Sequence, residues 1–237
     1  MNDQQFIKHL KCVVDCPGME CASNNSPCAH LIIPEWTNLL GWGNPQAKIV
    51  FVGINPLLTD TALTWHTPPK GVSQLKHAQN LTKIGAVNVR HFSYHCRILR
   101  ELREKDSELA KELPNIDELS KFAFFTEVAF CPSKKQSDLT KEIMKRCFRR
   151  NTVPFLMEPN FEVIIALGRM PSEICIDTFV SAEKAKNLRI YHGQSYIFDT
   201  GKHLITSYAP NARGRWDRSA VANLLYQLHK DRLLNLI

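Results

Sequence analysis

Apolar residues gather in four short runs along the chain, and amphipathic segments separate these runs. A run of about four to eight apolar residues that ends at glycine, proline or a polar residue is typical of a strand buried on both faces. The predicted core strands cover residues 49–52, 122–130, 161–167 and 203–207. Strands buried on both faces are typical of parallel sheets, which need helical connections.

Helical spacing of apolar residues marks segments between these strands. We predict helices over residues 3–11, 91–112, 170–180 and 217–235, a helix that Asp138 caps and that carries Cys147, and a hairpin over 188–200. Alternating strands and helices predict an α/β fold, a three-layer α/β/α sandwich with a central four-stranded, mainly parallel sheet. We expect one domain over residues 1–237, with a cysteine-rich segment, 1–34, clamped to its core.

The stretch from residue 57 to about residue 90 shows no clear period and contains Trp65, His66, two prolines and a glycine. Long irregular segments in compact domains are usually functional loops or disordered segments. Because aromatic and basic residues follow the first core strand closely, we interpret this stretch as a binding loop.

The composition is that of a folded chain: 237 residues, 44% hydrophobic and 22% charged. No apolar run approaches the roughly 18 residues that span a bilayer, and the N-terminus has no apolar signal core. We therefore expect a cytoplasmic protein with no membrane contact. The net charge of +7 fits a polyanionic partner, but many basic proteins never bind nucleic acid.

A reducing compartment disfavours disulfides between the eight cysteines. Four of them crowd near the N-terminus, at Cys12, Cys16, Cys21 and Cys28. Metal or cluster ligation is the leading interpretation, a structural zinc on these four residues is a second one, and buried inert thiols are the third.

The segment 48–56, KIVFVGINP, delivers a polar side chain directly after a buried strand. Gly53 ends the apolar run, and Asn55 stands between Ile54 and Pro56. Open α/β sheets bind ligands at the carboxyl ends of their strands. This turn is therefore a candidate site, with a simple Asn turn as the alternative.

The order of such segments resembles the uracil-DNA glycosylase superfamily over nearly the whole chain. The segments that carry the resemblance are GWGNP leading into KIVFVGINP, FFTEVAFCPSK, VIIALGRMP and SYAPNARGR. The GINP form resembles the mismatch-specific uracil and thymine glycosylases, and FFTEVAFCPSK resembles the second strand of the superfamily's iron–sulfur branch. The resemblance implies a DNA glycosylase that flips out a base and hydrolyses its N-glycosidic bond.

The same resemblance implies roles for residues around the first strand. Asn55 would orient the attacking water, and the amides near Gly53 and Ile54 would line the base pocket. Asp60 is close enough in sequence to be a rival acid–base residue. Trp65 is the candidate for stacking on the flipped base, although ordinary core packing would also explain a tryptophan.

Three departures from the family pattern concern the base and the leaving group. Ile54 stands where the iron–sulfur branch has a glutamate, and Ala209 stands where its last motif has a histidine. Glu127 stands where an asparagine reads the uracil edge. A carboxylate only accepts hydrogen bonds, and the cytosine edge presents an amino donor that uracil lacks, so Glu127 points to a cytosine derivative. A strand carboxylate with local partners is the alternative.

The resemblance also implies a cofactor and a DNA surface. Cys131 and Cys147 lie 16 positions apart, as do the two downstream cluster ligands of the iron–sulfur branch. The implied [4Fe–4S] ligands are Cys12, Cys16, Cys131 and Cys147, although the distance back from Gly53 would suit Cys28 better than one of the first two. The implied DNA contacts in the last motif are Asn211, Arg213 and Arg215.

We therefore predict a monofunctional DNA glycosylase that acts as a monomer on a modified pyrimidine, with a modified cytosine in foreign DNA, such as phage DNA, as the expected substrate. A uracil or mismatch glycosylase of base-excision repair is the alternative within the enzyme class. A relative that binds an altered base without cutting is the alternative outside it.

Overall fold

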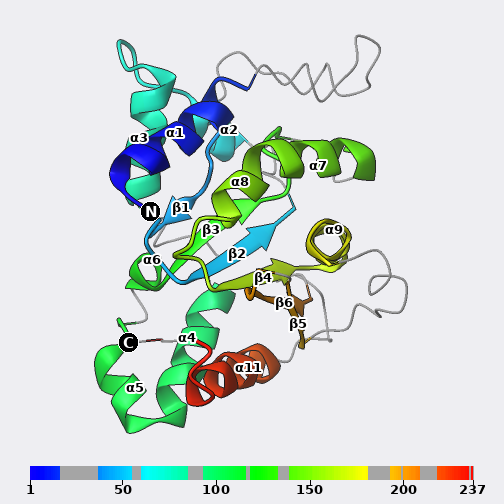
Figure 1. Cartoon of the computed structure of the whole chain (residues 1–237). Coiled ribbons are helices and arrows are strands. Elements are labelled where there is room, and N and C mark those ends of the chain that lie inside the picture. The colour runs from blue at the N-terminus through cyan, green and yellow to red at the C-terminus, as the bar shows by residue number, and fades with distance from the viewer. Residues whose placement is uncertain are drawn as a thin grey trace.

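The computed structural model describes residues 1–16, 37–54, 60–84, 93–115, 118–132, 139–180, 193–198, 200–208, 218–234 and 236. Within these residues the chain has an α/β fold in which helices cover both faces of one mixed sheet (Figure 1). None of the helices described here is both long and apolar enough to cross a membrane.

The sheet has six strands in the order β1-β3-β2-β4-β6-β5. Its centre is formed by β3 (Ala123–Glu127), β2 (Ile49–Gly53), β4 (Val163–Leu167) and β6 (His203–Ser207), all mutually parallel. The edge strands β1 (Trp42–Gly43) and β5 (Gln194–Ile197) run antiparallel to their neighbours. The predicted α/β class is thus confirmed, but the predicted four-stranded sheet is wrong: the sheet has six strands and is mixed, with four parallel strands at its centre.

One face of the sheet is covered by α1 (Asp3–Val14), α3 (Gln74–Ile84), α7 (Lys141–Cys147), a π-helical turn η5 (Phe148–Thr152), α8 (Val153–Leu156) and α9 (Arg169–Phe179). Phe6 and Leu10 of α1 pack there with Phe124 and Phe155 of β3 and α8. An asparagine N-cap with a full capping box begins α1. The first helix is therefore part of the main core.

The opposite face is covered by α4 (Ser93–Lys105), α5 (Ser107–Glu112) and α11 (Arg218–Lys230). Strand residues alternate between the two faces, so Phe51 and Phe125 both point here and their rings stack at 5.1 Å. Their row continues to Gly53 and Glu127 at the carboxyl ends of β2 and β3. The short α6 (Leu119–Phe122) leads directly into β3.

Three local predictions are wrong. Residues 60–66 and 74–84 of the predicted loop are the helices α2 (Asp60–His66) and α3. The helix that carries Cys147 is capped by Thr140 and not by Asp138, which lies outside the described residues. The predicted hairpin over 188–200 is instead formed by β5 and β6, joined at Phe198 and Lys202.

Candidate functional site

The strand order changes direction between β2 and β4. The chain passes from β2 to β3 on one side, returns to β4 on the other side, and continues outward to β6. Ligands of open α/β sheets bind outside the carboxyl ends of the strands at such a switch point. Here that edge is formed by Gly53 at the end of β2, Ile54 after it, Gly168 after β4 and the neighbouring Glu127 at the end of β3.

The ends of β2 and β3 are held in one register. Gly53 pairs with Glu127, and the ladder continues because Val128 N donates to Gly53 O at 3.0 Å and Ala129 N donates to Ile54 O at 3.1 Å. The side chain of Ile54 packs against the core on the α1 face. The backbone beside Asn55 is thus fixed up to the residue before it, although Asn55 itself lies outside the described residues.

Gly53 leaves space beside the carboxyl group of Glu127. A methyl group at Gly53 would meet Glu127 Cγ at 3.6 Å and Oε1 at 3.8 Å, which are ordinary contacts. At Gly43, by contrast, a methyl group would lie 2.3 Å from Ala123 O, and φ is +102°. Packing therefore requires glycine at position 43 but not at position 53, where the described surroundings would accept alanine.

Glu127 is mostly buried and lacks a partner for its carboxyl group among the described residues. Thr152 Oγ1 donates to its backbone oxygen at 2.9 Å, which fixes the end of β3 without satisfying the side chain. Burial raises the pKa of Glu127 to about 8. This changes the predicted protonation state: the group is mainly a neutral acid at pH 7, with one O–H donor and one carbonyl acceptor.

Trp65 lies on α2 with 46% of its surface exposed, so the alternative that it belongs to the core is wrong. Two histidines fix this helix. His66 Nδ1 donates to Thr37 O and His77 Nε2 donates to Trp65 O, both at 2.8 Å. Burial lowers the pKa of His66 to about 4, so its ring stays neutral. Asp60, the rival acid–base residue, is exposed at the start of α2.

Asn211, Arg213 and Arg215, the predicted DNA contacts, lie outside the described residues, as do Ala209, Cys21 and Cys28. Their predicted roles stay predictions. The described chain resumes at α11, directly after the segment that carries them.

Two of the predicted cluster ligands converge on one buried amide. Asn151 Nδ2 lies 3.6 Å from Cys147 Sγ and 3.8 Å from Cys16 Sγ, and Asn151 and Cys147 are both less than 5% exposed. Cys16 follows α1, whereas Cys147 ends α7, so the fold itself brings together thiols 131 positions apart in sequence. Thiols brought together from distant segments fit a cluster or soft-metal site.

The other two predicted ligands are placed differently. Cys131 is half-buried just beyond β3, and Cys12 is exposed on α1. No group of three or more cysteine, histidine or acidic side chains arranged to hold a metal is found among the described residues. The described donors therefore supply one converging pair, and Cys21 and Cys28 belong to the part of the chain that is not described.

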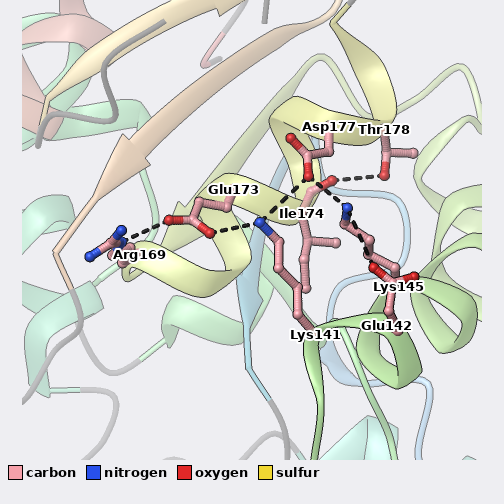
Figure 2. Close-up of polar contacts among 8 residues, drawn as sticks. All are labelled: Lys141, Glu142, Lys145, Arg169, Glu173, Ile174, Asp177 and Thr178. Atoms are coloured by element: carbon pink, nitrogen blue, oxygen red, sulfur yellow. Dashed lines mark hydrogen bonds and ion pairs between the residues drawn. The ribbon is translucent and has the colours of Figure 1, made fainter. Parts of the chain in front are cut away.

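Next to the switch point, α7 and α9 are joined by the ion pairs in Figure 2. Lys141 Nζ lies 2.8 Å from Glu173 Oε2 and 3.6 Å from Asp177 Oδ2, and Lys145 Nζ lies 2.8 Å from the same Asp177 oxygen. Arg169 Nε pairs with Glu173 Oε1 at 2.7 Å. We call these five residues the α7–α9 charge network. It fixes the helix that starts at the edge of β4.

Sequence reasoning missed Asn151 and the charge network. Asn151 lies four positions after Cys147, a spacing that places two helical residues on one face. That spacing was visible in the sequence, but the contact between Asn151 and Cys16, which lies 135 positions earlier, was not.

No protein-family model matches this sequence, and a search of the curated proteins finds no match either.

Proposed function

We propose that the protein is a DNA glycosylase that binds a flipped pyrimidine at the carboxyl edge of β2 and β3 and hydrolyses its N-glycosidic bond. The observation that carries the proposal is the carboxyl group of Glu127, which has no partner among the described residues and lies beside the space left by Gly53, two positions before Asn55. A buried polar group without a partner costs stability, and a ligand that pairs with it explains its presence.

Glu127 as a neutral acid is complementary to the Watson–Crick edge of a pyrimidine. Its carbonyl oxygen accepts from the amino group of a cytosine-type base, and its O–H donates to the ring nitrogen N3. A uracil edge can also satisfy one donor and one acceptor, so Glu127 in this state accepts both bases. Discrimination against uracil therefore rests on the rest of the pocket, and a modified cytosine of foreign DNA is our proposed substrate within the wider class of modified pyrimidines.

The reaction adds water across the bond between C1′ of the deoxyribose and N1 of the base. The water oxygen bonds to C1′, the electron pair of the broken bond stays on the base, and the proton of the water ends on the base. Asn55 would position the water because an amide cannot remove a proton at neutral pH. Glu127 would donate a hydrogen bond to N3, and this bond strengthens as negative charge develops on the leaving base. This donor would stabilise the leaving base in a chain that has Ala209 where the family has a histidine.

Trp65 and the positive charge of the chain supply the rest of the proposed DNA contact. Trp65 is exposed on a helix that two histidines fix, so its ring can stack on DNA without reorganising the helix. Asn211, Arg213 and Arg215 would contact phosphates, and one protein molecule would act on one site.

We further propose that Cys16 and Cys147 are ligands of a [4Fe–4S] cluster, with Cys131 and one further N-terminal cysteine, Cys12 in the first instance. The cluster would hold the N-terminus to the core in a reducing, cytoplasmic setting, and it takes no part in the reaction above.

The test is an abasic-site assay under single-turnover conditions. Duplex and single-stranded DNA would carry uracil, mismatched thymine, or cytosine modified at C5. We expect alkali-labile abasic sites in DNA that carries at least one of the modified pyrimidines. The single-turnover excision rate should fall by about 100-fold or more in the Asn55→Ala variant. Asn44→Ala is the matched control, because Asn44 is a turn asparagine whose side chain accepts from Gln46 N and donates to Lys121 O.

The outcomes separate the proposed activity from the alternatives. Equal rates for wild type and Asn55→Ala would contradict the role of Asn55. Tight binding to modified DNA without any abasic product would support the non-catalytic alternative. Robust excision of uracil and mismatched thymine alone would favour base-excision repair.

A further inference from the structure

We infer that the side-chain amide of Asn151 positions two metal-bound thiolates, those of Cys16 and Cys147. This inference rests on the proposed cluster and assigns a new residue to it. Asn151 is not a ligand in this scheme. It acts through the sulfurs, as a hydrogen-bond donor beside them.

The geometry of the amide supports this role. A carboxamide nitrogen carries two hydrogens, and the two sulfurs lie 3.6 Å and 3.8 Å from Nδ2 of Asn151. These are hydrogen-bond distances for sulfur acceptors. One side chain can therefore donate to two cysteines from distant segments, Cys16 just after α1 and Cys147 at the end of α7, directly before η5.

The other end of the same amide is unsatisfied. Asn151 Oδ1 is buried and has no hydrogen-bond partner among the described residues. Leaving a buried acceptor unpaired is destabilising. Hydrogen bonds to neutral thiols are weak and offset little of this cost, whereas hydrogen bonds to charged thiolates are about twice as strong as neutral ones. The Asn151 amide would therefore stabilise the two sulfurs most when both bind metal as thiolates.

The backbone at this position is also unusual. Asn151 lies in the π-helical turn η5, which follows Cys147 directly. Such turns are rare and are frequently found at functional sites. The side chain of Thr152, the next residue, donates to Glu127 O and so fixes the turn to the end of β3. The turn thus holds Asn151 against both sulfurs and also connects this corner to the proposed base site.

Donors beside ligating sulfurs have two measurable effects. They reduce the negative charge on the thiolates, which raises the reduction potential of an iron–sulfur cluster. They also orient the ligands, and loss of such partners typically costs about 10- to 100-fold in metal affinity. Neither effect is expected from an asparagine that only fills space in the core.

The experiment compares Asn151→Leu with Asn160→Leu in the full chain, purified without oxygen. Leucine has nearly the shape of asparagine but no donor and no unpaired acceptor. Asn160 is the matched control, because its Nδ2 donates to Pro45 O and Ala47 O and its Oδ1 is likewise buried without a partner among the described residues. Iron and sulfide per chain, the rate of iron loss to a chelator and the reduction potential are measured.

We expect wild type and Asn160→Leu to hold iron and sulfide equally. We expect Asn151→Leu to lose iron about tenfold faster or more and to show a more negative potential, while the metal-free variant is at least as heat-stable as metal-free wild type. If leucine does not fit, Asn151→Ala removes the donor without added bulk and should give the same two shifts.

Three results would overturn the inference. A cluster retained at the wild-type rate and potential in both Asn151 variants would refute the role of Asn151 and leave the cluster intact. Equal iron loss in Asn160→Leu would show a general loss of packing. Wild type that takes up no iron and sulfide on anaerobic reconstitution would refute the cluster and this inference together, and the abasic-site assay would still decide the proposed activity.

Discussion

Glu173 lies on α9, the helix that follows β4, and Glu127 ends β3. Among the described residues, partners are present for the carboxyl group of Glu173 but not for that of Glu127. Partial burial opposes ionisation of Glu173, but hydrogen bonds from Lys141 and Arg169 outweigh it and lower its pKa. Glu127 is more deeply buried, has no partner among the described residues, and burial alone raises its pKa to about 8. Folding therefore supplies hydrogen-bond partners for the carboxyl group of Glu173, whereas the described residues supply none for that of Glu127.

Polar groups that stabilise the fold have partners within it, whereas a buried polar group without such a partner is a candidate for binding a ligand. The α7–α9 charge network neutralises its own carboxylates and fixes α9 at the edge of β4 (Figure 2). Glu127 and the Oδ1 atom of Asn151 are costs that the described structure does not offset. Such costs are expected where a site trades stability for function.

The largest effect should follow from removing the carboxyl group of Glu127. We expect Glu127→Ala to lower single-turnover excision by about 100-fold, because the base loses its only proposed donor to N3. Glu127→Gln keeps a donor and an acceptor and should stay within about tenfold of wild type at pH 7. Rates between pH 6 and 10 check the protonation state: wild type should lose activity above about pH 8, as Glu127 ionises, and Glu127→Gln should not.

The same carboxyl group makes a stability prediction with a definite sign. Its pKa is about 8 in the folded protein and about 4.3 in the unfolded chain. Between these values the folded state binds the extra proton, so wild type should lose stability as pH rises from about 4 to about 8, relative to Glu127→Gln. Urea unfolding of both proteins at pH 5 and pH 9 measures this difference. Parallel pH profiles would show that Glu127 is paired in the folded protein.

A smaller effect should follow from filling the space beside Glu127. Gly53→Ala adds a methyl group at ordinary contact distance from the carboxyl group, so the melting temperature should stay near that of wild type. Excision should fall about tenfold, because the methyl group occupies room that the base needs. Gly43→Ala is the control: its methyl group would clash with Ala123 O, so the fold should be destabilised strongly. Wild-type excision by a fully stable Gly53→Ala protein would move the base site elsewhere.

The core of the fold was predictable because buried parallel strands are continuous apolar runs. Residues 203–207 were predicted with their exact bounds, and the strands at 49–53 and 163–167 nearly so. The edge strand Trp42–Gly43 was not predictable, because two residues carry no period and pair only through contacts with β3. The wider sheet is thus a product of tertiary pairing.

The helices at residues 60–66 and 74–84 were missed for a related reason. Neither segment carries a strong apolar stripe, and prolines stand between them. What fixes α2 is the pair of histidine hydrogen bonds to Thr37 O and Trp65 O, and one of these joins segments 29 positions apart. Local pattern cannot report such contacts. The sequence placed Glu127 inside a strand predicted over 122–130, whereas β3 ends at Glu127. Its burial without a partner among the described residues, and with it its raised pKa, depends on tertiary contacts and was not predictable.

The smallest effect should come from the satisfied side of the comparison. Lys141→Met removes the cation that pairs with both Glu173 and Asp177, whose side chains are 19% and 36% exposed. We expect a loss of about 1 kcal/mol in the free energy of unfolding, reduced in high salt because the pairs are partly exposed, and no change in excision by the folded protein. Both carboxyl groups have lowered pKa values, because cationic hydrogen bonds outweigh their partial burial. Their contribution is therefore present above the ordinary carboxyl pKa of about 4 and lost as pH falls through the folded values, so wild type and variant should converge in acid.

Arg169→Ala is the control, because the Arg169 side chain is 89% exposed and its removal should leave the urea midpoint unchanged. A Lys141→Met protein that loses excision while remaining folded would place the charge network in the site and end the distinction drawn between Glu173 and Glu127.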